Sequence, residues 1–233
     1  MKEVSRICIP LFFILLFACD SGDDKPFGLE DKQFFPLQKG YFLQFQVQST
    51  VYTAGPVGTV NQFQKKWLVI ERFINDENEE SFILHELTRV NESADWSYQK
   101  TLQATINSFG LIIEEDNKGF QKLKFPVVKG NEWNVNEFNI EPEKNIKIID
   151  LLDTKEVENF TYPNVAEVEY SNEVDRIIGN DIQREWFAYQ VGLIETYTEK
   201  ITYCTNTPAC LGQQIIQSGI IESTKLIAYG VEE

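Results

Sequence analysis

The sequence is poor in the side chains that most often carry catalysis or bind metals. It has one histidine, His85, one methionine and four cysteines in 233 residues. No G-x-S-x-G nucleophile motif, phosphate-binding loop, dinucleotide fingerprint or His-rich metal motif occurs. A general base needs a nucleophile within hydrogen-bonding reach and usually an orienting partner, and nothing near His85 predicts either. We therefore expect His85 to be a structural or surface residue, and we predict no catalytic residue, no cofactor and no metal site.

Basic residues are also scarce, because 21 Lys and Arg face 36 Asp and Glu, which gives a net charge of −15. Phosphate binding draws on clustered Lys and Arg, so nucleic acid is not an expected partner. Acidic runs at residues 76–80 and 114–117 offer oxygen ligands for Ca²⁺, yet neither has the spacing and glycine turn of a dedicated loop. We interpret both as solvated turns. Acidic residues are so numerous that no carboxylate pair can be assigned to glycoside hydrolysis.

Long hydrophobic runs are missing as well. The apolar stretch at residues 7–17 follows Lys2 and Arg6, and it is shorter than the roughly 20 residues that a membrane-spanning helix needs. A basic lead, a short apolar core and a small residue at Ala18 are typical of a signal peptide. We predict that residues 1–18 are removed.

The residues at the cut are Leu16-Phe17-Ala18-Cys19, which resemble the lipobox of bacterial lipoproteins. This resemblance implies a diacylglycerol thioether on the Cys19 sulfur and an acyl group on its new amine. One acyl chain holds a protein only marginally, whereas several give a stable anchor. The alternative is an ordinary signal peptide followed by a chance cysteine. The lipid on Cys19 is expected to attach the N terminus of the mature chain to the membrane, which is therefore one expected partner.

Residues 19–33 begin with Asp20-Ser21-Gly22-Asp23-Asp24-Lys25, an acidic stretch that cannot bury apolar area and predicts a flexible tether. It resembles the acidic export tag of Bacteroidota lipoproteins, which implies transfer to the cell surface. In an enterobacterium, Asp20 directly after the lipidated Cys19 would instead imply retention in the inner membrane. We expect attachment to the outer membrane, with surface exposure as a further possibility.

Cys204 and Cys210 are the remaining cysteines of the mature chain. An exported protein enters a compartment where disulfides persist, and five intervening residues suit a staple across the end of a hairpin. The spacing does not match the redox C-x-x-C motif, and two thiols without a nearby histidine fall short of a structural zinc site. We predict a disulfide between Cys204 and Cys210.

From residue 41 onward, apolar residues recur with the period of two that is typical of β-strands. At residues 41–51, Tyr41, Leu43, Phe45 and Val47 share one face, while the other face is mostly glutamine. This predicts a sheet that is packed on one side and solvated on the other. Residues 145–160 fit either a helix or a strand followed by a loop, and the strand is favoured. We predict a mainly β protein with little helix, a curved antiparallel sheet of half-barrel or sandwich-like form, in a single domain over residues 34–233.

A six-residue motif occurs twice, as Phe35-Pro36-Leu37-Gln38-Lys39-Gly40 and as Phe125-Pro126-Val127-Val128-Lys129-Gly130. Proline ahead of a glycine turn ends one element and starts an extended one. Two related sheet layers are one interpretation, although six residues do not establish a duplication. Together with residues 130–133, 162–165 and 186–194, these motifs resemble a broad group of uncharacterised Bacteroidota outer-membrane lipoproteins. The resemblance implies a curved antiparallel sheet, similar in shape to the half-barrel lipoprotein carriers, and it brings no catalytic residue.

Aromatic residues are the remaining signal for a ligand. They either line a concave sheet that accepts an apolar or glycan ligand, or fill the core of the domain, and they are Tyr41, Phe45, Trp67, Trp96, Tyr98, Trp133, Trp186, Phe187 and Tyr189. The sequence therefore predicts a noncatalytic, lipid-anchored envelope protein that acts as a binding or assembly module on the outer membrane, with another envelope protein or an apolar ligand as its partner. A carrier of an apolar ligand and a hydrolase of envelope or dietary polymer remain alternatives.

Overall fold

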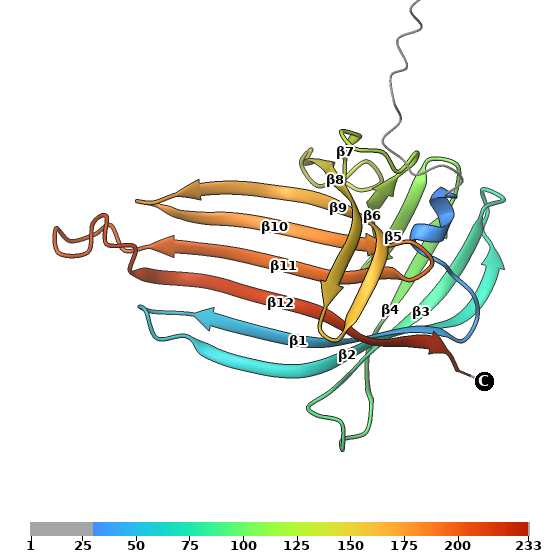
Figure 1. Ribbon diagram of the computed structural model, residues 1–233, viewed down its shortest axis with the longest axis horizontal. Helices are drawn as coiled ribbons and strands as arrows, with labels where there is room; N and C mark the ends of the chain where they lie inside the picture. Colours follow the sequence, from blue (N-terminus) through green and yellow to red (C-terminus); the bar gives the residue numbers. More distant parts are fainter. Residues whose placement is uncertain (1–29, 233) are drawn as a thin grey trace, which may run out of the picture.

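The computed structural model describes residues 30–232, which form one sheet of twelve antiparallel strands (Figure 1). The strands are β1 (Tyr41–Tyr52), β2 (Thr59–Ile74), β3 (Glu80–Arg89), β4 (Ser97–Ile106), β5 (Gly110–Glu115), β6 (Lys118–Lys124), β7 (Glu132–Asn134), β8 (Asn145–Val157), β9 (Phe160–Asp175), β10 (Gly179–Ala188), β11 (Gly192–Tyr203) and β12 (Ile216–Val231). The described residues contain no α-helix, and their one helical element is the 3₁₀ helix η1 (Asp31–Phe34). The predicted fold class, a curved antiparallel sheet with little helix, is confirmed.

The sheet consists of two six-stranded meanders joined through their outer strands. Its strand order is β6-β5-β4-β3-β2-β1-β12-β11-β10-β9-β8-β7, so β1 pairs with β12 at the centre. The two edges, β6 and β7, curl toward each other and meet through a few contacts. The Gln121 amide donates to the Val135 carbonyl (2.9 Å), and Trp133 Nε1 donates to the Gln121 carbonyl (2.7 Å). The sheet is therefore nearly closed and has an interior.

Alternation along β1 explains which face of the sheet is inside. Tyr41, Leu43, Phe45 and Val47 are buried, while the intervening residues are more exposed, because successive strand residues point to opposite faces. The same rule applied across the paired strands gives one continuous apolar cluster inside the curl.

The repeated Phe-Pro-x-x-Lys-Gly motif forms the same turn at the start of each meander. Gly40 and Gly130 have φ of 83° and 87°, a left-handed conformation that glycine adopts without strain. Each glycine amide donates a 2.8 Å hydrogen bond to the second strand of its meander. Gly40 donates to the Val69 carbonyl of β2, and Gly130 donates to the Ile148 carbonyl of β8. The motif thus starts β1 in one half and β7 in the other.

Residues 145–157 form a strand, as favoured from the sequence, but a two-residue turn stands in place of the expected loop. β8 turns directly into β9 at residues 158 and 159, with Glu158 at φ 53°. The edge strand β6 ends at Lys124, shortly before Pro126, which has no N–H to donate to a strand ladder.

η1 packs against the sheet. Phe34 is 1% exposed and meets Tyr189 edge to face at 5.6 Å between ring centroids. The Asp31 carboxylate accepts a hydrogen bond from the Val127 amide (2.8 Å), and the Gln33 carbonyl accepts one from Gln190 (2.7 Å). The boundary drawn from the sequence between tether and domain, at residue 34, therefore falls inside a packed element. The predicted signal peptide, the lipidation site Cys19 and residues 19–29 of the tether lie outside the described residues.

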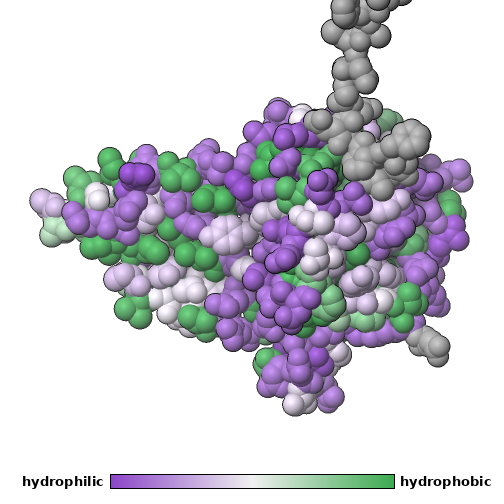
Figure 2. All heavy atoms as spheres, in the orientation of Figure 1, coloured by the Kyte–Doolittle hydropathy of each residue, from purple (hydrophilic) through white to green (hydrophobic). Residues whose placement is uncertain are grey.

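Cys204 and Cys210 form the predicted disulfide, with 5.6 Å between their Cα atoms. It closes the loop between β11 and β12, at the end of the sheet that projects to the left in Figure 1. Figure 2 shows apolar surface among polar surface toward this end of the sheet. The exposed apolar residues near the strand ends there include Val60, Val174, Ile177, Ile178 and Leu211.

Replacing both cysteines by serine is expected to lower the free energy of unfolding by about 2 kcal/mol, because a bridge across so short a loop removes little entropy from the unfolded chain. Urea unfolding followed by circular dichroism measures the change. Reducing agent should lower the stability of the wild type by the same amount and leave the double variant unchanged. A larger loss in the variant than in the reduced wild type would contradict this account.

Candidate functional site: the interior cavity

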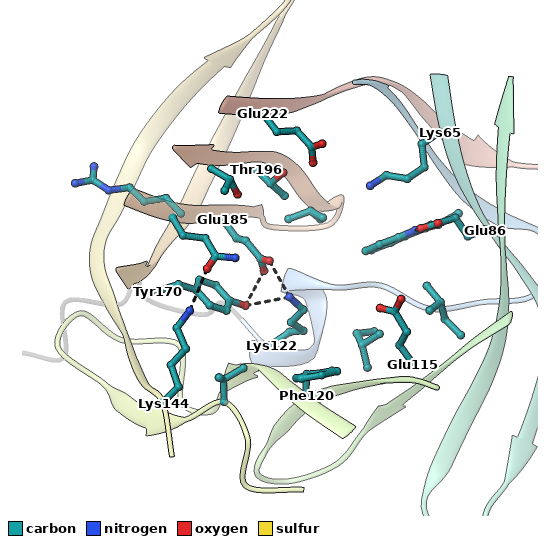
Figure 3. A pocket seen from close by; sticks show the side chains of 18 of the residues that line it. Lys65, Glu86, Glu115, Phe120, Lys122, Lys144, Tyr170, Glu185, Thr196 and Glu222 are labelled. Atoms are coloured by element: carbon teal, nitrogen blue, oxygen red, sulfur yellow. Dashed lines mark hydrogen bonds and ion pairs between the residues drawn. The ribbon is translucent and has the colours of Figure 1, made fainter. Parts of the chain in front are cut away.

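The concave side of the curled sheet holds a half-open cavity of about 420 Å³ (Figure 3), within the range of about 300–1,000 Å³ typical of ligand sites. Its walls come from strands of both meanders, from β2 to β6 on one side and from β9 to β12 on the other. Apolar side chains form part of the lining, namely Trp67, Leu102, Phe120, Ile113, Val135 and Leu193. The rest is polar, with four basic residues and four glutamates among the lining side chains.

A hydrogen-bonded cluster of Lys122, Tyr170 and Glu185 occupies one wall. Lys122 Nζ lies 2.8 Å from Glu185 Oε1, and the Tyr170 hydroxyl donates to Glu185 Oε2 at 2.9 Å. Lys122 also donates to the Tyr170 hydroxyl at 3.2 Å and lies over its ring. Burial first, and then the Glu185 carboxylate, raise the pKa of Tyr170 well above its ordinary value, so the phenol stays protonated and donates.

A second wall holds Glu86 and Glu115. Glu86 accepts a hydrogen bond from Trp67 Nε1 (2.8 Å) and lies 3.7 Å from Lys100, which also pairs with Glu115. Burial alone would lower the pKa of Lys100, but the hydrogen bond to Glu115 and the nearby carboxylates together raise it. These contacts fix the positions of both carboxylates at the cavity surface.

Two lysines of the lining lack a carboxylate partner. Lys144 donates to the Gln183 side-chain oxygen (3.0 Å) and lies over the Tyr170 ring, while Lys65 lies over the Phe45 and Trp67 rings at 5.8 and 5.7 Å. Within residues 30–232, neither ammonium group forms an ion pair with a carboxylate. Burial lowers the pKa of both lysines below the ordinary value.

Most of the nine aromatic residues singled out from the sequence are packed away from the cavity. Tyr41, Phe45, Trp133, Trp186 and Phe187 belong to the buried core, and Tyr189 packs against it. The structure places Trp67 alone of the nine in the cavity wall. Trp96 is stacked by Arg89 (4.4 Å) and Lys66 (5.2 Å), and Tyr98 is largely exposed. Six of the nine therefore build the core or pack against it without lining the cavity, and most of the cavity lining consists of other residues.

His85 faces away from the cavity. Its neighbour Glu86 lines the cavity, and successive residues of β3 point to opposite faces of the sheet. The imidazole packs edge to face on Tyr98, with 5.2 Å between ring centroids. In residues 30–232, no three His, Cys, Asp or Glu side chains are grouped so that they could hold a metal ion. That part of the chain also has no helix of the length and apolarity needed to cross a membrane.

The acidic runs at residues 76–80 and 114–117 include hairpin turns, as interpreted from the sequence, but Glu80 begins β3, Glu114 and Glu115 end β5, and Glu115 lines the cavity. Asn75 Oδ1 accepts hydrogen bonds from the amides of Glu77 and Glu79, which shapes the turn between β2 and β3. Asp116 and Asn117 have φ of 50° and 61°, the left-handed pair that a two-residue hairpin turn requires.

Sequence analysis did not find Lys65, Lys122, Tyr170, Glu185 and Glu222, which define the polar part of the cavity. They lie on five strands that are far apart in sequence, so no local motif joins them. The sequence feature that indicates part of the site is Phe63-Gln64-Lys65-Lys66-Trp67. Period-two alternation places Lys65 on the same face of the strand as the aromatic residues Phe63 and Trp67.

Four tyrosines make the fold sensitive to alkaline pH. Burial is the main cause of a raised pKa in all four. The pKa rises to about 12 for Tyr162 and Tyr197. It rises well above the ordinary value for Tyr41 and Tyr170. A raised pKa in the folded state gives stability that is complete below the unfolded value of about 10 and is lost as pH rises toward the folded value. We expect the urea midpoint to fall between about pH 10 and pH 12.

The Tyr162 hydroxyl is buried and has no hydrogen-bond partner in the described part of the chain. Tyr162→Phe should therefore keep or slightly raise stability at pH 7 and reduce the alkaline loss, which urea midpoints at pH 8 and pH 11 would show. Equal pH dependence in the variant and the wild type would contradict the assignment.

Comparisons with known proteins found two solved structures. One is a candidate lipoprotein from Parabacteroides distasonis ATCC 8503, with 14% identity, a TM-score of 0.38, and coverage of 84% of this chain and 98% of that chain. The other is a candidate exported protein with a YmcC-like fold from Bacteroides fragilis NCTC 9343, with 10% identity, a TM-score of 0.40 and the same coverage. No family model matches the sequence, and a search of curated proteins found no match.

Proposed function

We propose that this protein is a noncatalytic, lipid-anchored protein of the outer membrane whose folded domain binds a small ligand in the interior cavity. The observation that carries the proposal is the cavity of about 420 Å³, whose apolar wall is combined with a few fixed polar groups. The Cys19 lipidation motif supports the anchor, with a negatively charged domain held to the membrane by lipid rather than by charge.

The lining supports a binding protein more strongly than a carrier of a purely apolar ligand. An apolar molecule would cover Lys65 and Glu222, which have no hydrogen bond or ion pair within residues 30–232, and desolvating charged groups without partners is costly. A ligand with both apolar and polar parts fits the same walls without that cost.

The glutamates of the cavity argue against a hydrolase. A glycosidase needs one carboxyl group that holds a proton and a second that is ionised. Glu115 and Glu185 each pair with a lysine, and Glu86 accepts a hydrogen bond from Trp67 and lies near Lys100. Three of the four cavity glutamates are therefore already paired with side chains of the protein, which leaves Glu222 alone and no free pair of carboxylates for this chemistry.

The anchor is tested by Cys19→Ser. We expect the variant to leave the membrane fraction and appear in the soluble envelope fraction, with the lipid-dependent mass increment absent from the protein. Cys8→Ser, which falls within the segment expected to be removed, is the matched control and should fractionate like wild type. Unchanged membrane association of Cys19→Ser would contradict the lipid anchor.

The cavity is tested by filling it. Thr198 of β11 lines the cavity, whereas Thr202 of the same strand is exposed at its far end. Native mass spectrometry of protein purified from its own envelope should show a bound small molecule on the wild type and on Thr202→Trp, and none on Thr198→Trp. Equal occupancy of all three proteins would place the ligand outside the cavity and overturn this proposal.

A further inference from the structure

Lys65 and Glu222 are the charged residues of the cavity lining that have neither a hydrogen bond nor an ion pair within residues 30–232. The other six take part in such contacts through their side chains, namely Glu86, Glu115, Lys122, Lys144, Arg184 and Glu185. The Lys65 ammonium contacts the Trp67 and Phe45 rings, which attract a cation but accept no hydrogen bond from it of ordinary strength.

The two side chains extend into the same space from different strands. Figure 3 shows Lys65 from β2 and Glu222 from β12 pointing toward the same part of the cavity. Between these strands lies β1, which pairs with both. Their charged atoms are too far apart for an ion pair. Burial lowers the pKa of Lys65, and Glu86 first and then Glu222 act in the opposite direction and favour its charged form. A gap therefore separates a partly buried ammonium group from a partly buried carboxylate.

A partly buried charge without a partner costs stability, and an added group of opposite charge recovers that cost. An anionic hydrogen-bond acceptor on a ligand would stabilise the Lys65 ammonium group, and a cationic donor would stabilise the Glu222 carboxylate. Because four basic residues balance four glutamates in the lining, a ligand with net charge would leave one charge uncompensated. A ligand that carries both charges leaves none, and charge-assisted hydrogen bonds at its two ends are about twice as strong as neutral ones.

The apolar part of the lining lies beside this pair of charges. Trp67 neighbours Lys65 on the cavity side of β2, and Phe120 and Leu102 extend the apolar wall. An apolar group on the ligand would pack there and gain about 25 cal/mol for each Å² removed from water.

We infer that the cavity binds a small zwitterion that carries an apolar group, with its anionic group at Lys65 and its ammonium group at Glu222. This inference rests on the proposed function, because it specifies the ligand of the same cavity. Amino acids or short peptides and the ethanolamine phosphodiester headgroup of a lipid share this chemistry.

The experiment is isothermal titration of the purified domain with four probes. L-phenylalanine carries both charges, N-acetyl-L-phenylalanine carries the negative charge alone, and L-phenylalaninamide carries the positive charge alone. Glycerophosphoethanolamine carries both charges without the ring. We expect a zwitterion to bind at least tenfold more tightly than either singly charged probe, and the tighter of the two zwitterions identifies the source.

Variants assign each end of the ligand. Lys65→Met should remove the preference for L-phenylalanine over its amide, and Glu222→Gln should remove the preference over its N-acetyl form. Lys200→Met, at an exposed position of β11, is the matched control and should bind like wild type. Circular dichroism confirms that each variant is folded, and Lys65→Gln repeats the test if Lys65→Met does not fold.

The inference is wrong if neither zwitterion binds, or if the variants leave the preferences unchanged. If a singly charged probe binds more tightly than both zwitterions and Thr198→Trp abolishes that binding, the binding cavity stands and the zwitterion inference falls. If probes bind equally to wild type and Thr198→Trp, both the cavity and its proposed ligand are wrong.

Discussion

Phe45→Ala is expected to lower the free energy of unfolding by about 3–5 kcal/mol, the range for removing a fully buried phenylalanine ring. Phe45 has no exposed surface and lies in the central strand β1. Its ring meets Trp67 edge to face at 5.8 Å, and it stands directly opposite Lys65 in the pairing of β1 with β2. The cavity left by alanine would open next to the ligand site, in a part of the sheet that cannot collapse without moving both meanders.

Thermal unfolding measures this change. In a domain of this size, 1 kcal/mol lowers Tm by about 2–4 °C, so we expect a fall of about 10 °C. Phe109→Ala removes the same ring from a turn where it is 66% exposed, and this control should lower Tm by no more than about 2 °C. Similar losses at both positions would show that the interior cluster does not dominate stability.

Glu185→Leu is expected to cost about 3 kcal/mol, because it leaves the Lys122 ammonium partly buried without its carboxylate and removes the acceptor of the Tyr170 hydroxyl. The side chains of Lys122 and Glu185 are 24% and 10% exposed, so the loss falls at the lower end of the range for buried pairs. Urea unfolding at pH 7 provides the measurement.

The triple variant Lys122→Met, Tyr170→Phe, Glu185→Leu tests the cause. Since it removes all three polar groups together, it should recover most of the loss and come within about 1 kcal/mol of wild type. Lys225→Met breaks the half-exposed pair with Glu158 and should cost no more than about 0.5 kcal/mol. A triple variant less stable than Glu185→Leu would mean that the cluster stabilises the fold through its polar contacts.

The fold was largely predictable from the sequence because its determinants are local. Alternation fixes strand identity residue by residue, as along β1, and the Gly40 and Gly130 turns follow from a motif that is visible by eye. The disulfide followed from spacing and compartment. The packing of η1 was not predictable, because it depends on Asp31 and Gln33 meeting Val127 and Gln190, which lie far away in sequence.

The candidate site was not predictable for the same reason. Period-two alternation shows that Lys65 and Phe45 share a face with their neighbours, but it does not show which strands curl together or how far. Lys122 and Glu185 are 63 residues apart, and their contact depends on the edge strand β6 approaching β10 across the interior. The aromatic content of the sequence indicated the core. The residues that distinguish a cavity from a filled core are the charged side chains on the inner face of the sheet, and alternation alone does not identify them.

The pairing of β1 with β12 has a consequence for how the chain matures. Because β1 precedes all the other strands in the chain and β12 follows them, β1 can pair with β12 only after β12 has been synthesised. The middle of the sheet therefore forms last. Until then β1 has one unsatisfied edge, which is a template for wrong pairing, and contacts so distant along the chain form slowly. We therefore expect the newly made polypeptide to need protection by a chaperone during this interval, and its two halves to pair in a single late step.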